Sequence, residues 1–394
     1  MKPLKPVFNT IRRPLKRAKV YIKQKAGWLG IPKILPYRGY GDYENIYIQG
    51  MVIEDSGLTK PEDRQKVWQN ILATLKRFSS DEIAGVRVKA EFLGLTEETE
   101  TDEHGFFSFH FRVEEIENKL LEKDWHEVSF ELMDRVVEDQ PETRATGEVR
   151  IVSPGEGRVI VSDIDDTVLI SHSTQTLRKL RLMLFKNALS RLPFKGVSWF
   201  YNALEKGPDK KSYFPFFYVS SSEWNLYDLL EDFFAHNKIP RGVFMLRKLE
   251  SSIYKFWKSG QGNHEHKYDK IKALLNYYKT YKFILIGDSG QRDPLIYKRL
   301  ALEFPGRIEA IYIRKIGSGQ FFKDMDSLHK SLKKAGTTYL QVEDTLDAAR
   351  HAMEHGFIHE DYLREMAEKK EEGEREIVED EEAEPEKPGA GSSE

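Results

Sequence analysis

Residues 158–169 read RVIVSDIDDTVL, and this stretch decides how the second half of the chain is expected to fold. Its opening, Val159–Val161, is an apolar β-branched run, which is typical of a strand buried in a parallel sheet. Polar residues follow at once: Asp163, Asp165, Asp166 and Thr167. Carboxylates at the end of a buried strand are costly unless they bind something. In open α/β sheets, ligands bind at that end of the strands.

The spacing of Asp163 and Asp165 indicates a chemistry. They lie two residues apart where the strand gives way to a loop, so they can converge on one centre. One carboxylate can attack phosphorus to form an aspartyl-phosphate, and the other can exchange protons with the leaving oxygen and with water. A carboxylate and a phosphate repel each other, so a hard cation such as Mg²⁺ is needed. The alternative is that this cluster only caps a helix.

Composition bounds the class of protein. The chain has 394 residues, of which 40% are hydrophobic, so two domains or one enlarged domain with a real core are expected. It has no cysteine, which excludes disulfides, thiolate metal sites and a cysteine nucleophile. We see no secretory signal and no apolar stretch long enough to span a bilayer. A cytoplasmic protein, peripheral to the membrane, is the expectation.

Charge is distributed unevenly along the chain. Residues 1–41 hold eleven Lys and Arg residues and no acidic residue. We expect a basic arm over residues 1–36, which can lie on an anionic membrane surface. Its composition equally allows contact with nucleic acid. A third possibility is a solvated extension that packs on a domain edge. Residues 363–394 are rich in Glu and are expected to be a disordered acidic tail.

Residues 37–155 are expected to form a β-rich, sandwich-like domain. The predicted strands are Asn45–Ile53, Val86–Leu93, Phe106–Val113, Trp125–Leu132 and Thr146–Val152. A helix starting near Pro61 interrupts them, with Val67, Ile71, Leu75 and Phe78 on its apolar face.

Residues 156–362 alternate strand and helix patterns, which predicts a parallel sheet with crossovers. After Val159–Ser162 the predicted strands are Phe216–Val219, Val243–Leu246, Phe283–Ile286, Ile308–Ile313 and Tyr339–Val342. The segment Ser173–Leu192 has an apolar stripe and many basic residues. It is either an ordinary packing helix or a lid or lipid-facing element above the acidic loop.

Three more polar positions are candidates for the same site. Ser220 and Ser221 follow a strand and can hold phosphate oxygens, although serines are also common turn residues. Lys267 precedes a helical pattern and can neutralise phosphate and carboxylates, whereas locally a surface lysine is the simpler interpretation. The run FILIGDSGQRDP (283–294) carries Asp288, placed to bind a hard cation, and Asp293, which can bind it through water or orient Lys267.

The order of these motifs resembles the haloacid dehalogenase superfamily of phosphatases, whose DxDxT motif matches Asp163, Asp165 and Thr167. The sequence around these motifs resembles in particular the actin-patch phosphatidate phosphatase family, as a homologue of bacterial type. The matching stretches are DIDDT (163–167), YVSSSEWNLY (218–227), HKYDKI (266–271), FILIGDSGQRDP (283–294) and YRGYGDYENIYIQG (37–50). The sequence departs from the family pattern at Ser221 and Glu223, where Asn and Pro are expected, which leaves the substrate detail open.

The resemblance implies a Rossmann-like haloacid dehalogenase catalytic domain preceded by the all-β domain. It implies a Mg²⁺-dependent phosphomonoesterase that converts phosphatidate to diacylglycerol. The resemblance implies that Asp163 is the nucleophile and a metal ligand, and that Asp165 is the general acid/base with its carbonyl on the metal. Thr167 would orient the loop, and Ser220, Ser221 and Lys267 would hold the phosphate. Asp288 would complete the metal site, with Asp293 behind it.

Two other functions remain open from the sequence. One is the same chemistry on a soluble or nucleic-acid phosphomonoester, although no nucleic-acid partner is expected. The other is a non-catalytic membrane-binding scaffold that uses the β-rich domain and the basic arm. The leading hypothesis has a phospholipid substrate and peripheral contact with an anionic membrane through residues 1–36.

Overall fold

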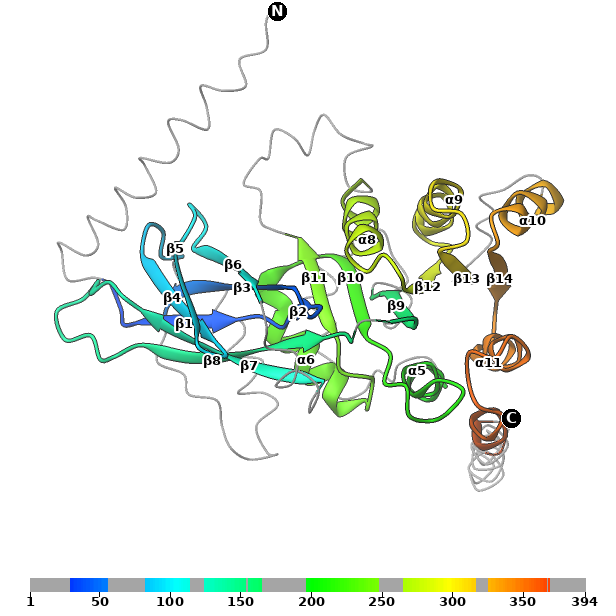
Figure 1. Ribbon diagram of the computed structural model, residues 1–394, viewed down its shortest axis with the longest axis horizontal. Coiled ribbons are helices and arrows are strands. Elements are labelled where there is room, and N and C mark those ends of the chain that lie inside the picture. The colour runs from blue at the N-terminus through cyan, green and yellow to red at the C-terminus, as the bar shows by residue number, and fades with distance from the viewer. Residues whose placement is uncertain are drawn as a thin grey trace, which may run out of the picture.

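The computed structural model describes residues 29–55, 82–113, 124–153, 155–164, 196–247, 265–316 and 325–366, together with residue 368. Figure 1 shows two parts, an all-β part and an α/β part, which lie against each other. The basic arm as far as residue 28, the predicted helix after Pro61, the segment Ser173–Leu192 and almost all of the acidic tail lie outside the described residues.

The all-β part is one hydrogen-bonded sheet of eight strands. The strands are β1 (Pro32–Pro36), β2 (Gly39–Gly41), β3 (Asn45–Glu54), β4 (Arg87–Phe92), β5 (Leu95–Glu100), β6 (Phe106–Arg112), β7 (Trp125–Leu132) and β8 (Arg144–Ile151). Their order is β1-β3-β2-β8-β7-β4-β5, and β6 pairs with β3. Because β5 and β6 also lie side by side, the sheet curls around a core that includes Phe92, Phe109 and Phe130.

The five strands predicted in residues 37–155 are all present, with ends that shift by up to two residues. Strands β1, β2 and β5 were not predicted. The boundary expected at residue 36 lies inside the β sheet, because β1 pairs antiparallel with β3 and buries Ile34. The predicted boundary was wrong because it was placed by the run of basic residues, which includes Lys33. In the structure, Lys33 alternates with the buried side chains of strand β1.

The α/β part is built on a six-stranded parallel sheet. Its strands are β9 (Arg158–Asp163), β10 (Phe216–Glu223), β11 (Val243–Arg247), β12 (Lys282–Asp288), β13 (Ile308–Arg314) and β14 (Thr338–Val342). The order β11-β10-β9-β12-β13-β14 puts the first strand in the centre, as in doubly wound α/β sheets. Each of the six strands contains a predicted run, and β10 extends four residues beyond the predicted end at Val219.

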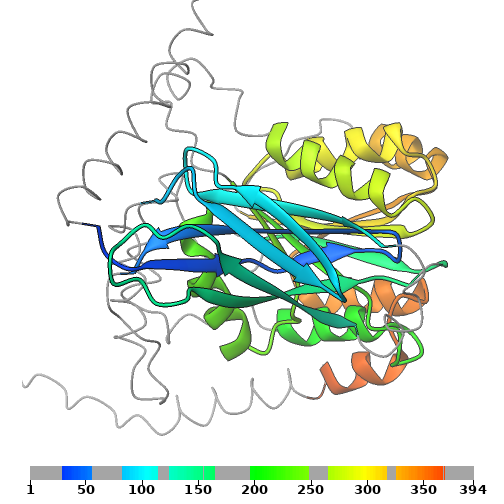
Figure 2. The same ribbon diagram turned by 60° about the vertical axis from the view of Figure 1, so that its left-hand side comes forward.

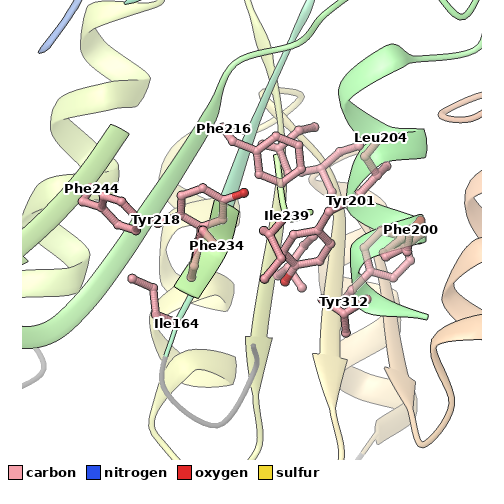
Figure 3. Close-up of a cluster of buried hydrophobic side chains, with 14 of the residues drawn as sticks. Ile164, Phe200, Tyr201, Leu204, Phe216, Tyr218, Phe234, Ile239, Phe244 and Tyr312 are labelled. Atoms are coloured by element: carbon pink, nitrogen blue, oxygen red, sulfur yellow. The ribbon is translucent and has the colours of Figure 1, made fainter. Parts of the chain in front are cut away.

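Helices cover both faces of this sheet (Figures 1 and 2). One layer holds α5 (Val197–Lys206), α6 (Tyr227–His236, after the short 3₁₀ helix Trp224–Leu226) and α11 (Thr345–Glu354). The other holds α8 (Glu265–Tyr277), α9 (Asp293–Glu303) and α10 (Met325–Lys334). Successive strand residues point to opposite faces, so Phe216 and Tyr218 pack with α5 and α6 (Figure 3), while Phe217 and Val219 pack beneath α8.

An aromatic contact joins the two parts. Tyr37, between β1 and β2, stacks on Trp224 with ring centroids 4.3 Å apart and lies 4.7 Å from the ring of Tyr227. Its neighbour Arg38 donates its backbone N–H to the Tyr227 hydroxyl at 2.9 Å, and its guanidinium pairs with Glu231 at 3.0 Å. The β1–β2 segment is therefore attached directly to the end of β10 and the start of α6.

A second contact reaches the helix on the opposite face of the parallel sheet. The Tyr40 ring packs edge-on against Phe217 of β10 and Tyr277 at the end of α8, with centroids 5.5 and 5.2 Å away. The Tyr277 hydroxyl donates to the Asn45 carbonyl of β3. In the part of the chain that the structure describes, no helix is both long enough and apolar enough to cross a membrane.

We predict that Tyr37→Ala destabilises the protein by about 3 kcal/mol, because it removes a buried aromatic ring between two others. Chemical denaturation would measure the change, and a double-mutant cycle with Trp224→Ala should give a coupling of about 0.5–1.5 kcal/mol. Tyr213→Ala is the matched control, because the Tyr213 side chain is 47% exposed. Equal losses in Tyr37→Ala and Tyr213→Ala would contradict the proposed contact.

Candidate active site

Strand register brings the first acidic motif next to the last. Asp163 is the final residue of β9, the central strand, and lies opposite Val219 of β10. On its other side β9 pairs with β12, where Ser162 lies opposite Ile286 and Asp288 ends the strand. Because all three strands are parallel, their carboxyl ends meet at one edge of the sheet. That is the edge at which doubly wound folds bind ligands.

Asp163, Asp288 and Asp293 form a compact acidic cluster. One carboxylate oxygen from each lies within 4.8 Å of the others. All three residues are at most 1% exposed. Buried carboxylates are stable only when counter-charges or ligands compensate them. Oxygen donors at this spacing suit a hard divalent cation such as Mg²⁺, so the donor set fits the predicted metal.

Lys267 supplies positive charge to this cluster. It lies in the first turn of α8 and is buried. Its ammonium nitrogen is 2.8 Å from an Asp163 oxygen and 2.8 Å from an Asp293 oxygen. The surface position that the local sequence favoured for this lysine is therefore wrong: Lys267 is buried between Asp163 and Asp293, and its role there stays a prediction.

Asp293 reaches the cluster because it is the first residue of α9 and because residue 287 is a glycine. A Cβ atom on Gly287 would lie 2.7 Å from the Asp293 Oδ2 atom and 2.9 Å from the Tyr297 ring. In the structure, the side chains that use this space are Asp293 and Tyr297.

The loop between β12 and α9 is held by its own polar groups. Asp288 Oδ1 accepts the backbone N–H groups of Gly290 at 2.6 Å and Gln291 at 2.9 Å. The Ser289 hydroxyl accepts the N–H of Ile316, beyond β13, at 2.7 Å. One carboxylate oxygen of Asp288 is therefore engaged by backbone N–H groups of the loop, and Ser289 fixes the loop to the end of the neighbouring strand β13.

Ser220 lies at the same edge and is buried in β10. Its hydroxyl accepts the backbone N–H of Ser222 at 2.9 Å. The Lys270 ammonium of α8 donates to the Ser220 carbonyl at 3.4 Å and to the Met245 carbonyl at 2.8 Å. Lys270 thus ties the ends of β10 and β11 together. We did not predict it, because a lysine that binds carbonyls has no local signature.

The structure does not locate every predicted residue. Asp165 and Thr167 lie outside the described residues, so their placement relative to Asp163 stays a prediction. Ser221 is half-buried, between the buried Ser220 and Ser222. The described site therefore consists of Asp163, Lys267, Asp288 and Asp293, with Ser220 on the adjoining strand.

The acidic cluster also affects its neighbours. Burial raises the pKa of the Tyr297 hydroxyl well above its ordinary value, and the carboxylates of Asp293, Asp163 and Asp288 raise it further. Tyr297 is therefore a neutral donor, and it donates to the Ile286 carbonyl at 3.0 Å. This bond connects α9 to β12 immediately before the end of the strand that carries Asp288.

We predict that Gly287→Ala lowers the free energy of unfolding by about 1–3 kcal/mol, the usual result of overpacking a full site. The new methyl group would collide with Asp293 and Tyr297. Thermal and denaturant unfolding would measure the loss, and Ile286→Val in the same strand would control for a small local change of volume. An unchanged midpoint for Gly287→Ala would contradict the close approach described above.

Part of the chain that carries this site is similar to proteins of a known family. Residues 158–315 match the family described as "Phosphatidate phosphatase APP1, catalytic domain". The chain is 33% identical over 163 residues to the phosphatidate phosphatase APP1 of Saccharomyces cerevisiae, which covers 41% of this chain and 26% of that protein. It is 25% identical over 279 residues to an uncharacterized protein of Schizosaccharomyces pombe, covering 69% of this chain and 44% of the relative.

The chain thus spans less than half the length of these two relatives. Among solved structures, a carbohydrate acetylesterase from Xanthomonas citri aligns over 77% of this chain and 66% of its own, with 10% identity and a TM-score of 0.26. A score that low carries no argument about fold or function. The similarity to a phosphatase catalytic domain covers β9 to β13 and includes the three carboxylates of the acidic cluster and Lys267.

Proposed function

We propose that this protein is a Mg²⁺-dependent phosphomonoesterase of the haloacid dehalogenase superfamily that converts phosphatidate to diacylglycerol. The observation that carries the proposal is the buried cluster of Asp163, Asp288 and Asp293, in which Lys267 pairs with Asp163 and Asp293. It lies within a segment that is similar to the catalytic domain of a phosphatidate phosphatase.

In the proposed reaction, an Asp163 oxygen attacks phosphorus and forms an aspartyl-phosphate as the phosphorus–oxygen bond to the glycerol breaks. We assign to Asp165 the proton that the leaving oxygen takes up. Water then attacks the aspartyl-phosphate, gives a proton to Asp165, and releases inorganic phosphate and free Asp163. Lys267 balances charge on the phosphoryl oxygens, and Ser220 is proposed to donate its O–H to one of them.

Asp163, Asp288 and Asp293 are the residues that would hold the metal, with the carbonyl of Asp165 as the further ligand expected from the resemblance. When bound, Mg²⁺ supplies the positive charge that lets an anionic nucleophile approach an anionic phosphate. One part of this assignment is specific to the structure. Asp293 contacts Lys267 at 2.8 Å, so it orients the lysine as well as adding charge to the metal site.

A phospholipid is the proposed substrate because the matched family and one relative are described as phosphatidate phosphatases. The basic residues at the N-terminal end of the chain would favour contact with an anionic membrane surface. A protein peripheral to such a membrane is the arrangement that this substrate requires, because phosphatidate is presented at a lipid–water interface.

Phosphate release from phosphatidate in mixed micelles tests the proposal, measured with Mg²⁺ or with EDTA. We expect Asp163→Asn to lower kcat at least about 1,000-fold, because it removes the nucleophile of a covalent mechanism. Asp326→Asn, an exposed aspartate on α10, is the matched control and should keep full activity.

The same assay with a soluble phosphomonoester separates the remaining possibilities. Mg²⁺-dependent release from the soluble ester alone would keep the mechanism and change the substrate. Release from phosphatidate that persists in EDTA would reject the metal, and full activity of Asp163→Asn would reject the nucleophile. If the wild-type protein released no phosphate from either substrate, the non-catalytic scaffold would be favoured.

We further predict that Lys270→Met raises KM about tenfold with a smaller change in kcat, because hydrogen bonds from a charged donor hold the Ser220 segment in place. Steady-state kinetics on a soluble phosphomonoester measure this effect. Lys272→Met, on the same helix, removes a surface ion pair with Glu303 and should have little effect. Equal KM values for the two variants would show that Lys270 does not position Ser220.

A further inference from the structure

Gln291, in the loop between β12 and α9, contacts both members of the Asp163–Lys267 ion pair. Its side-chain oxygen accepts from the Lys267 ammonium group at 3.1 Å. Its side-chain NH₂ group donates to the second oxygen of Asp163, Oδ2, at 3.4 Å, while Lys267 lies against Oδ1. One neutral side chain therefore closes a ring with the proposed nucleophile and the proposed phosphate-binding cation.

The partners also fix which way the amide faces. Only the carbonyl oxygen of Gln291 can accept from the ammonium group, and only the nitrogen can donate to the carboxylate. The reversed amide would set donor against donor and acceptor against acceptor. The orientation of the Gln291 side chain is thus determined by the charges of Lys267 and Asp163.

The backbone of Gln291 leaves it little freedom to move. Its N–H group donates to Asp288 Oδ1 at 2.9 Å, and the preceding Ser289 is held by Ile316 through its hydroxyl. Asp293, two residues later, is fixed by its contact with Lys267. The backbone is therefore anchored on both sides of Gln291, which keeps its side chain next to Asp163.

The chemistry of the site explains why an amide is suited to this position. Three carboxylates already cluster here with one ammonium group to balance them, so a fourth carboxylate would add repulsion next to the nucleophile. A lysine or arginine could donate to Asp163 but could not accept from Lys267. An amide does both without changing the charge of the site.

We propose that Gln291 is a positioning residue that sets the rotation of the Asp163 carboxylate and holds Lys267 beside it. In-line attack needs one carboxylate oxygen aimed at phosphorus, and small misplacements of a reacting group are costly to the rate. Gln291 acts through Asp163 and Lys267, so its loss should slow the chemical step and leave substrate binding largely intact. The kinetic part of this inference rests on the phosphatase function proposed above.

Two variants separate this role from simple filling of space. Gln291→Met keeps most of the volume and removes both contacts, and we expect kcat to fall about tenfold with KM within about twofold. Gln291→Glu keeps the shape but places an oxygen with negative charge against Asp163, and we expect kcat to fall about 100-fold. Gln341→Glu makes the same charge change at an exposed glutamine of β14 and should retain full activity.

A thermal double-mutant cycle tests the contact independently of turnover. Melting temperatures of the wild type, Gln291→Met, Asp163→Asn and the double variant should be non-additive, because residues in one hydrogen-bonded network are coupled. Additive shifts would overturn the inference whatever the enzyme does. Non-additive shifts in a protein that releases no phosphate from any ester would support the contact while rejecting the proposed function.

The kinetic results can also overturn it. A Gln291→Glu variant that is as active as wild type would show that the side chain only fills space. A rise in KM with unchanged kcat, in either variant, would assign Gln291 to substrate binding instead of positioning. The expected pattern, with kcat in the order wild type, Gln291→Met, Gln291→Glu and with nearly constant KM, follows only from positioning.

Discussion

Three clustered, buried carboxylates, two of them paired with one buried ammonium group, impose the main constraint on this structure. Ionised groups removed from water are destabilising unless partners or ligands lie close to them. Asp163, Asp288 and Asp293 must therefore cluster, and Lys267 must pair with Asp163 and Asp293. That requires β9 and β12 to be neighbours, and α8 and α9 to begin at the same edge of the sheet. It also requires Gly287, because any side chain there would displace Asp293.

The all-β part supports the same edge from outside. Tyr37 and Arg38 hold the end of β10 and the start of α6, the segment that follows Ser220. Tyr40 packs on β10 and on the end of α8, the helix that begins near Lys267. The two proposed phosphate-binding residues thus lie on elements that the β1–β2 segment contacts directly. This arrangement connects the all-β part to the edge of the parallel sheet where the acidic cluster lies.

Much of the site was predictable because its signals are local. A buried strand that ends in acidic residues can be recognised from the sequence. Asp163, Asp288 and Asp293 were predicted on that basis, and they lie together in the structure. Lys267 was ambiguous, because a lysine at a helix start has the same local appearance on a surface as in a site. Gln291 and Lys270 had no such signal, since each acts through partners that are distant along the chain, Lys267 and Asp163 for one and Ser220 and Met245 for the other.

The sequence by itself determined the strands of the parallel sheet and the acidic residues at their ends, because apolar runs and adjacent carboxylates are properties of neighbouring residues. Only the tertiary structure decided that β1 belongs to the β sheet, although its composition resembles that of the basic arm. The tertiary structure also decided what Gly287 makes room for and which groups surround Lys267. Those features depend on distances between segments far apart in the chain, which the order of residues along the chain does not specify.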